Sequence, residues 1–435
     1  MASCVRQEGL SQATLRGGAF LAARYGLGML VSLGNMLVLT WWIGPHAYGV
    51  FVTAIGLVSF LASVARAGVD TYLVRVESVP CQKTYGVAGT VVVLTSVALT
   101  LAGGALIPPL VRWFGSREFV APYVVLLLSV PVVGLTGIPT AKLERELDFR
   151  RLASLELGGQ VLGLLLSSAL AWARCGVWAP VAGQMVWQCF LFAGTCRYSQ
   201  LTPCLRFDRL EASAMLRYGA GLTASLRTWQ LRTLVNPLLM GKFVGAEGVA
   251  FVAFAIRTAE ALGSVRLAAG RLAIAALARM QTNRERFRNA LEQALFLQVV
   301  TLGPLLCGFA LLGSWGIRHF AGSRWMPSLI VYPFVAAGVL VNSVYNLQAS
   351  ALFVVGKQWL VMRSYAAHVV LLSAGTLIFL PKLGIAGYGW AELLACGAYP
   401  LLQGGLRATP VSYRRLAPWL ATFAALLFVP MFWTN

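Results

Sequence analysis

Long apolar segments dominate this chain and restrict what it can fold into. A membrane-spanning helix needs about 20 mostly apolar residues, and thirteen segments of roughly that length follow one another along the 435 residues. They cover residues 17–42, 47–67, 86–111, 121–141, 152–173, 177–196, 218–241, 246–269, 291–313, 327–354, 360–380, 385–404 and 416–433. We therefore expect an all-α, polytopic membrane protein with about 13 transmembrane helices, within a range of 12–14.

Composition and charge agree with this expectation. Hydrophobic residues make up 58% of the chain and charged residues only 11%, too few for the surface of a soluble protein of this length. The net charge of +20 is the excess of 35 lysines and arginines over 15 aspartates and glutamates, and most of the basic residues fall in alternate loops. This bias predicts a cytoplasmic N-terminus and removes the need for a nucleic-acid partner. The first apolar segment is too long for a signal-peptide core, so we expect an uncleaved first helix.

The sequence contains no pattern of residues typical of a metal site or a cofactor site. The eight cysteines form no C-x-x-C pair and no Cys/His metal spacing. No loop is long enough for a catalytic domain, and no nucleotide-binding loop is present. We expect neither metal nor cofactor, and no enzyme activity. A membrane enzyme, such as a polysaccharide polymerase or glycosyltransferase, stays a less favoured alternative. Its candidate anion-binding residues would be His319, Arg318 and Arg324 of an outer loop.

Two pairs of similar stretches suggest an internal duplication. IGPHAYGVFVTA (43–54) resembles VGAEGVAFVAFA (244–255), and CGVWAPVAGQ (175–184) resembles LGIAGYGWAE (383–392). Because a six-helix unit has an even number of helices, its two copies enter the membrane in the same direction. We expect two lobes in a parallel pseudo-twofold repeat around a central cavity. The predicted lobes cover 1–196 and 217–404, joined by a cytoplasmic connector (197–216) and followed by an extra helix (405–435).

Four arginines fall inside the predicted spans. A charge at the centre of a bilayer is costly, so such groups normally face a cavity or a partner. Guanidinium also suits phosphate, because its planar fork can bind two oxygens. The pattern therefore predicts a cationic cavity for an anionic cargo, lined by Arg24, Arg227, Arg232 and Arg257.

Each embedded charge also has a structural alternative. Arg24 could extend to the cytoplasmic headgroups, and Arg257 could pair with Glu260 one turn later. Asp70, Glu260 and Glu392 are candidates for ion coupling or for charge pairing. Arg227 and Arg232 have no carboxylate within a helical turn, and Arg227 is the stronger candidate of the two because Arg232 could approach the outer headgroups.

Three stretches resemble a known family. The first stretch is similar to the family's G-P-x-x-[YF]-G turn, helix and small-residue turn; it is GPHAYGVFVTAIGLVSFLASVARAGVDTYLVR (44–75). The second is similar to its loop with an R-x-L-x-F-[KR] pattern and reads PTAKLERELDFRRLASLELGGQ (139–160). The third is similar to its second glycine turn and reads NPLLMGKFVGAEGVAFVAFA (236–255). The family is the Wzx-like polysaccharide exporter, or oligosaccharide flippase, branch of the multidrug/oligosaccharidyl-lipid/polysaccharide (MOP) superfamily. Asn236 and Pro237 depart from its pattern, because relatives commonly have an aspartate and a basic residue there.

The resemblance implies a flippase that carries undecaprenyl-diphosphate-linked oligosaccharide repeat units across the bacterial inner membrane by alternating access. The product would be O-antigen, capsule or exopolysaccharide. Arg24 and Arg257 occupy places comparable to cavity arginines of related lipid II flippases. Membrane lipids, a polysaccharide polymerase and export machinery are the partners implied. The alternative within the superfamily is an ion-coupled exporter of small molecules, which the shortage of embedded acids disfavours.

Overall fold

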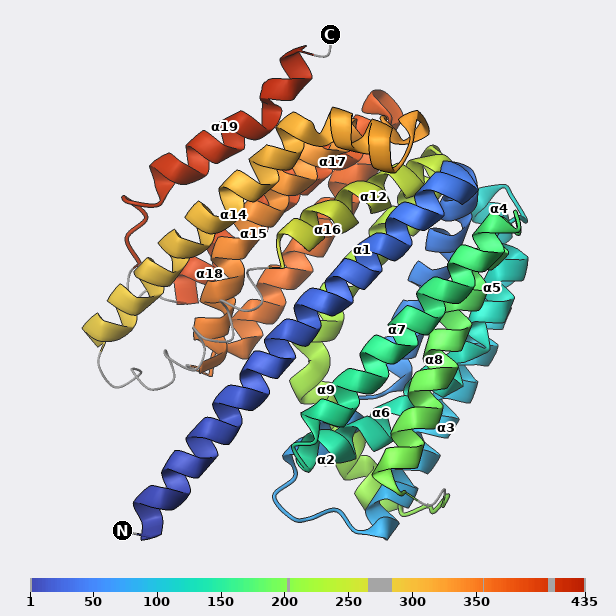
Figure 1. Ribbon diagram of the computed structural model, residues 1–435, viewed down its shortest axis with the longest axis vertical. Coiled ribbons are helices and arrows are strands. Elements are labelled where there is room, and N and C mark those ends of the chain that lie inside the picture. The colour runs from blue at the N-terminus through green and yellow to red at the C-terminus, as the bar shows by residue number, and fades with distance from the viewer. Residues whose placement is uncertain (1, 202–203, 265–283, 355, 406–410, 434–435) are drawn as a thin grey trace. The chain divides into compact units, whose positions relative to one another are not determined.

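The computed structural model describes residues 2–201, 204–264, 284–354, 356–405 and 411–433 (Figure 1). Within these ranges the regular structure is entirely helical, which confirms the predicted all-α class. Each of the thirteen predicted spans falls mainly on helical residues wherever it is described. Seven helical stretches are long and apolar enough to cross a membrane by length and composition, namely Gly26–Ala65, Gln82–Ala105, Val120–Arg145, Phe149–Trp172, Glu285–Phe320, Ser328–Phe353 and Gln358–Leu383.

The helices of the first half are mostly long and uninterrupted. Their bounds are α1 Ala2–Ala65, α2 Val69–Arg75, α3 Gln82–Ala105, α4 Ile107–Phe114, α5 Val120–Leu127, α6 Ser129–Arg145, α7 Phe149–Trp172, α8 Trp178–Ser199 and α9 Arg209–Gln230. α1 contains two of the predicted spans, because Gly44 interrupts it with a non-helical conformation and Pro45 follows.

The second half contains more short and irregular elements. Their bounds are α10 Arg232–Val235, η1 Asn236–Met240, α11 Gly241–Phe243, α12 Ala246–Leu262, α14 Arg284–Phe320, η2 Ser323–Trp325, α15 Ser328–Val354, α16 Gln358–Leu383, α17 Ile385–Ala395, η3 Cys396–Ala398, α18 Pro400–Gly405 and α19 Ala417–Trp433.

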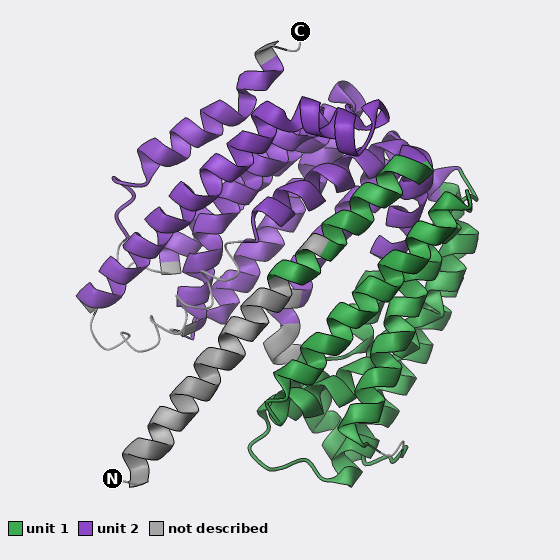
Figure 2. Cartoon of the chain, viewed as in Figure 1, with its two compact units in different colours: residues 1–43, 57–112, 116–223 green, residues 44–56, 113–115, 224–435 purple. Residues whose placement is uncertain are grey.

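The chain divides into two compact units (Figure 2). Unit 1 comprises residues 1–43, 57–112 and 116–223, and unit 2 comprises 44–56, 113–115 and 224–435. Residues 44–56 and 113–115 group with the second unit, and the boundary between the units falls within α9. Trp113 shows why, since its indole Nε1 donates to the Leu238 carbonyl of unit 2 at 2.9 Å.

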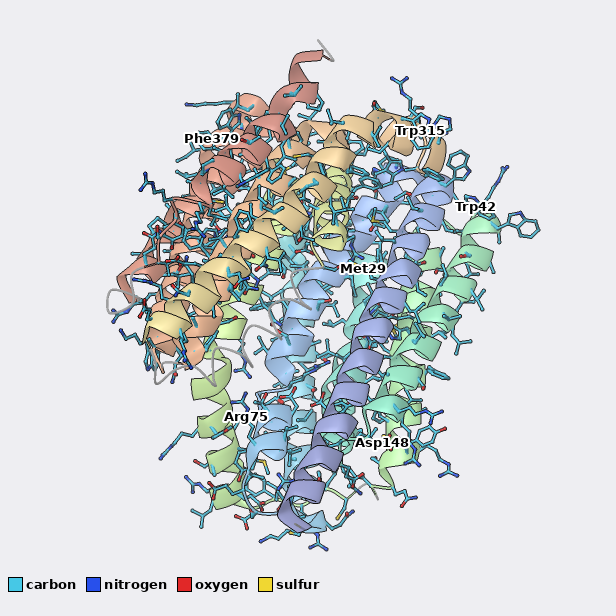
Figure 3. The ribbon with its side chains drawn as sticks, turned by 60° about the vertical axis from the view of Figure 1, so that its left-hand side comes forward. Met29, Trp42, Arg75, Asp148, Trp315 and Phe379 are labelled. Carbon is cyan, nitrogen blue, oxygen red and sulfur yellow. The ribbon has the colours of Figure 1, made fainter. Side chains whose placement is uncertain are left out.

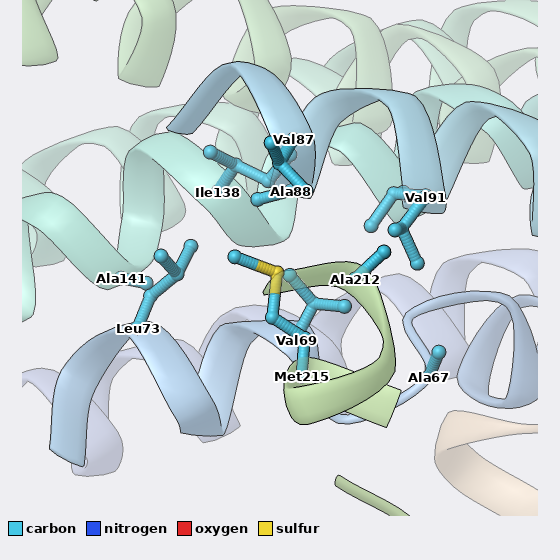
Figure 4. Close-up of a cluster of buried hydrophobic side chains, with 11 residues drawn as sticks. Ala67, Val69, Leu73, Val87, Ala88, Val91, Ile138, Ala141, Ala212 and Met215 are labelled. Carbon is cyan, nitrogen blue, oxygen red and sulfur yellow. The ribbon is translucent and has the colours of Figure 1, made fainter. Parts of the chain in front are cut away.

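Unit 1 has an apolar core close to the cytoplasmic ends expected for its helices. The core gathers side chains from α2, α3, α6 and α9 (Figure 4), among them Leu73, Val87, Ile138 and Met215. Burial of such side chains is the main favourable term in packing them together. Elsewhere, large apolar groups on the helix surfaces are exposed; Trp42 at the end of the first span extends away from the helices in Figure 3.

The R-x-L-x-F-[KR] stretch of unit 1 has a clear structural role. Arg145 donates from Nη1 to the carbonyls of Leu73 at 3.0 Å and Val76 at 2.7 Å, and from Nη2 to Ser78 at 2.9 Å. These carbonyls lie in the last turn of α2 and just after it, where no intrahelical donor remains. Two residues further, Leu147 adopts a left-handed φ of 58°. The motif therefore ends α6 and secures the end of α2 at Arg75 (Figure 3).

Asp148 caps the start of α7 (Figure 3). Its carboxylate accepts the backbone N–H of Arg151 at 3.2 Å. An aspartate in this capping position satisfies a donor that the helix itself cannot. The start of α9 uses the same device. The carboxylate of Asp208 accepts from the backbone of Leu210 at 3.1 Å and from Lys83 Nζ at 2.8 Å, which joins the connector to α3.

The duplicated glycine turns repeat at the level of backbone geometry. Gly44 has φ 74° and ψ 171°, and Gly245 has φ 85° and ψ −172°. This region of backbone space is essentially restricted to glycine. The second pair agrees in sign and size, because Gly176 and Gly384 both have φ 56°. Four glycines at matched places thus support the predicted duplication.

Candidate functional site

The seventh predicted span (218–241) is interrupted in its second half. α9 ends at Gln230, Leu231 forms a turn, and the four-residue α10 leads into the π-helix η1. Pro237 lies in η1 and offers no backbone N–H, so a regular helical ladder cannot continue through it. Interrupted membrane helices are typical of binding sites in transporters.

Arg232 opens this irregular stretch and has a carboxylate partner far away in the sequence. Its Nη2 donates to Oε1 of Glu392 on α17 at 2.5 Å. The Arg232 side chain is 14% exposed and that of Glu392 only 2%. A buried carboxylate needs such a counter-charge, so the pair explains how unit 2 tolerates both groups. The guanidinium also lies over the Trp229 ring, 5.3 Å from its centroid.

A row of aromatic rings continues from this pair through the interior of unit 2. Ring centroids are 5.2 Å apart for Trp229 and His368, 5.1 Å for His368 and Tyr399, and 5.0 Å for Tyr399 and Tyr345. The last two rings are nearly parallel, with 12° between their planes. Such contacts add to apolar burial and hold the rings in defined orientations.

Polar groups fix this row to the backbone. His368 Nδ1 donates to the Ala395 carbonyl at 3.1 Å, and Asn342 donates to the Tyr399 hydroxyl at 2.7 Å. Three buried atoms of the charge pair and its surroundings have no hydrogen-bond partner among the residues that the structure describes: Arg232 Nε, Glu392 Oε2 and His368 Nε2. Buried polar groups normally have partners, so this part of unit 2 retains the capacity to bind a polar ligand.

The predicted site residues occupy different surroundings. Arg227 is partly buried on α9, whereas Arg257 and Glu260 are both exposed on α12. No ion pair joins Arg257 and Glu260 among the side chains that the structure describes, so the alternative in which they pair one turn apart is not seen. Asp70 is partly buried in unit 1 and accepts the backbone N–H of Thr71 at 2.8 Å. Among the predicted residues, the structure brings Arg232 and Glu392 together in an ion pair.

Arg24 belongs to α1, but its side chain lies outside the described residues. Sequence analysis missed Glu156, which is partly buried in α7 and lies within the predicted span 152–173; a count of acids inside that span would have found it. It also missed Trp229 and Tyr399. Aromatic residues are common in membrane helices, so only their contacts with His368 set these two apart.

Comparison with solved structures defines the class of fold. The chain superposes on the lipid II flippase MurJ in its inward closed conformation with a TM-score of 0.77, 14% identity, and coverage of 98% of this chain and 92% of that one. A multidrug resistance MATE family transporter of the MOP superfamily in its inward-facing conformation gives a TM-score of 0.63, 16% identity, and coverage of 92% and 96%. The chain therefore shares the fold of these two proteins, the second of which is described as a member of the MOP superfamily.

Sequence comparison defines the family. The chain matches the succinoglycan biosynthesis transport protein ExoT of Rhizobium meliloti with 23% identity over 287 residues, which is 65% of this chain and 57% of that protein. The match therefore spans little more than half of the relative's length. The polysaccharide biosynthesis protein family matches residues 38–330, and the chain belongs to this family. It is a multi-pass membrane protein of the polysaccharide biosynthesis protein family.

Proposed function

We propose that this chain carries polyprenyl-diphosphate-linked oligosaccharide repeat units from the cytoplasmic to the periplasmic leaflet of the bacterial inner membrane. The observation that carries the proposal is Arg232, a partly accessible arginine on an interrupted membrane helix in a polysaccharide biosynthesis family member. A guanidinium at such a place suits the phosphates of a lipid-linked cargo. Membrane lipid would accommodate the polyprenyl tail.

We also propose an orientation in the membrane, a transport cycle and partners for the chain. The N-terminus is in the cytoplasm, as the distribution of basic loops predicts. Transport proceeds by alternating access, and Arg24, Arg227 and Arg257 assist in binding the cargo. A polysaccharide polymerase and export machinery act after it. The relative ExoT supports an exopolysaccharide product, since its name assigns it to succinoglycan biosynthesis.

The test is the lipid content of cells that lack the gene, compared with cells in which a plasmid restores it. Lipid extracts are analysed by mass spectrometry for polyprenyl-diphosphate-linked oligosaccharide. Accumulation of the complete repeat unit, reversed by the plasmid, is the expected result and also identifies the sugar. Intact surface polysaccharide with no lipid-linked intermediate would instead favour export of small molecules, the function that the MATE family fold suggests.

A further inference from the structure

The Arg232 guanidinium has unused binding capacity. Guanidinium carries five N–H donors in a planar fork, yet among the described residues Arg232 makes one hydrogen bond, from Nη2 to Glu392. Its Nε is buried and has no partner. An ion pair that uses one edge of the fork in this way leaves room for a second group with several acceptor oxygens.

The carboxylate partner is held in place by close packing. Within the described part of the chain, Glu392 Oε2 is buried without a hydrogen-bond partner, and the contact with Arg232 is made by Oε1. Behind it, α15 has a glycine. A Cβ added at Gly338 would lie 2.9 Å from Glu392 Cγ and 3.0 Å from Oε1. The absence of a side chain at Gly338 therefore allows the carboxylate to reach Arg232.

The two members of the pair differ in what can reach them. Arg232 keeps 14% of its side-chain surface exposed, against 2% for Glu392. Arg232 also belongs to a helix that is interrupted at Leu231 and again at η1, whereas Glu392 lies within continuous α17. A ligand can thus approach the arginine directly, and the arginine is on the element with fewer regular hydrogen bonds.

We propose that Glu392 acts as an internal competitor for a diphosphate group, which displaces the carboxylate when it binds Arg232. This inference rests on the proposed function, because the diphosphate is that of the lipid-linked cargo. A diphosphate offers more acceptor oxygens and more negative charge than one carboxylate. The competing carboxylate weakens binding, and the cargo can therefore be released after it crosses the membrane.

The test measures binding of farnesyl diphosphate to the purified full-length chain in detergent. Glu392→Gln keeps the shape of the side chain and removes its charge, and it should bind about tenfold more tightly if the pair is closed for about 90% of the time in the wild type. Arg232→Gln should lose most of the binding. The double variant, in which no buried charge is left unpaired, should bind as weakly as Arg232→Gln.

Gly338→Ala gives a second way to loosen the pair, by steric contact instead of charge removal. It should also tighten binding, and it keeps the proposal testable if Glu392→Gln fails to fold. Asp208→Asn is the matched control. It neutralises an acid of the connector that is paired with Lys83 of α3, outside the Arg232–Glu392 pair. Its affinity for farnesyl diphosphate should equal that of the wild type.

Three probes separate the chemical sources of the phosphate. Inorganic pyrophosphate should show the same tightening in Glu392→Gln as farnesyl diphosphate, and farnesol should show none. Tightening only toward phosphatidylglycerol vesicles would overturn the assignment to the cargo. The competitor role would be overturned if a folded Glu392→Gln variant bound farnesyl diphosphate no better than the wild type. This holds even if cells that lack the gene accumulate the lipid-linked repeat unit. Failure of that accumulation would count against the proposed function itself.

Discussion

Gly49 lies so close to Ala246 that a Cβ on Gly49 would be 1.8 Å from the Ala246 carbonyl oxygen. Both residues belong to unit 2, and each follows one of the two duplicated glycine turns. Only glycine permits this approach of the α1 and α12 backbones. The contact explains why residues 44–56 group with unit 2.

Replacement of Gly49 by alanine should therefore destabilise unit 2. Because the clashing atom belongs to the backbone, α12 must move, and we expect a loss of about 1–3 kcal/mol or more in the free energy of unfolding. Thermal unfolding in detergent measures it. Gly308→Ala is the control, since nothing lies within 4 Å of a Cβ there. Equal stability of Gly49→Ala and wild type would contradict the backbone contact.

Gly245→Ala tests the backbone conformation apart from packing. A Cβ at Gly245 has nothing within 4 Å, but its φ of 85° strains any other residue. The expected loss is about 1–3 kcal/mol. Gly44→Ala should give a similar loss, because the duplicated turns share one conformation. Thermal unfolding of both variants is the measurement, and a large loss at one glycine with none at the other would refute the equivalence.

Arg145→Ala should loosen the segment that follows α2. Five backbone carbonyls, from Leu73 to Ser78, lose a charged donor, and hydrogen bonds to charged groups contribute about 1.5–3 kcal/mol each at most. We expect lower stability and faster proteolysis between residues 76 and 81, measured by limited digestion and peptide mapping. Arg150→Ala, an exposed neighbour in the same motif, is the control. Identical digestion of both variants would exclude the capping role.

Acid should weaken the attachment of the connector. The hydrogen bond from Lys83 and those from the backbone hold the pKa of Asp208 below its ordinary value. A carboxyl whose pKa is lower in the folded state stabilises the fold above its unfolded pKa of about 3.9, and loses that effect as the pH falls through the folded pKa. The difference in unfolding temperature between wild type and Asp208→Asn should be small, because the group is exposed. It should be largest at neutral pH and vanish in strong acid; a difference independent of pH would contradict this.

Arg227→Ala should abolish polysaccharide export while the protein stays in the membrane. Arg227 is partly buried on α9, where the proposed function gives it a role in binding the anionic cargo. Surface polysaccharide is quantified in cells that express each variant, with the amount of protein in membranes measured by immunoblotting. Arg151→Ala, which removes a surface ion pair with Asp148, should export normally. Normal export by a well-expressed Arg227→Ala variant would remove Arg227 from the site.

Local properties of the sequence, such as the length of apolar runs and the positions of glycines, predict most of the helices and turns. Helices form wherever an apolar run is long enough, because a backbone in lipid must satisfy its own hydrogen bonds. The glycine turns at Gly44 and Gly245 were visible as a repeated pattern, since no other residue readily adopts that conformation. Asn236 and Pro237 also stood out in the sequence, but the π-helix that contains them did not, because it depends on how the helix packs.

The sequence by itself determined the membrane-spanning helices, the repeat and the presence of costly embedded charges. Tertiary structure alone decided which charges meet. Arg232 and Glu392 are separated by 160 positions, and no periodicity within one helix can relate residues on α10 and α17. The same holds for the contacts of His368 with Trp229 and Tyr399. Hydrophobicity and backbone hydrogen bonding are local properties, whereas the pairing of a buried charge depends on which helices lie side by side.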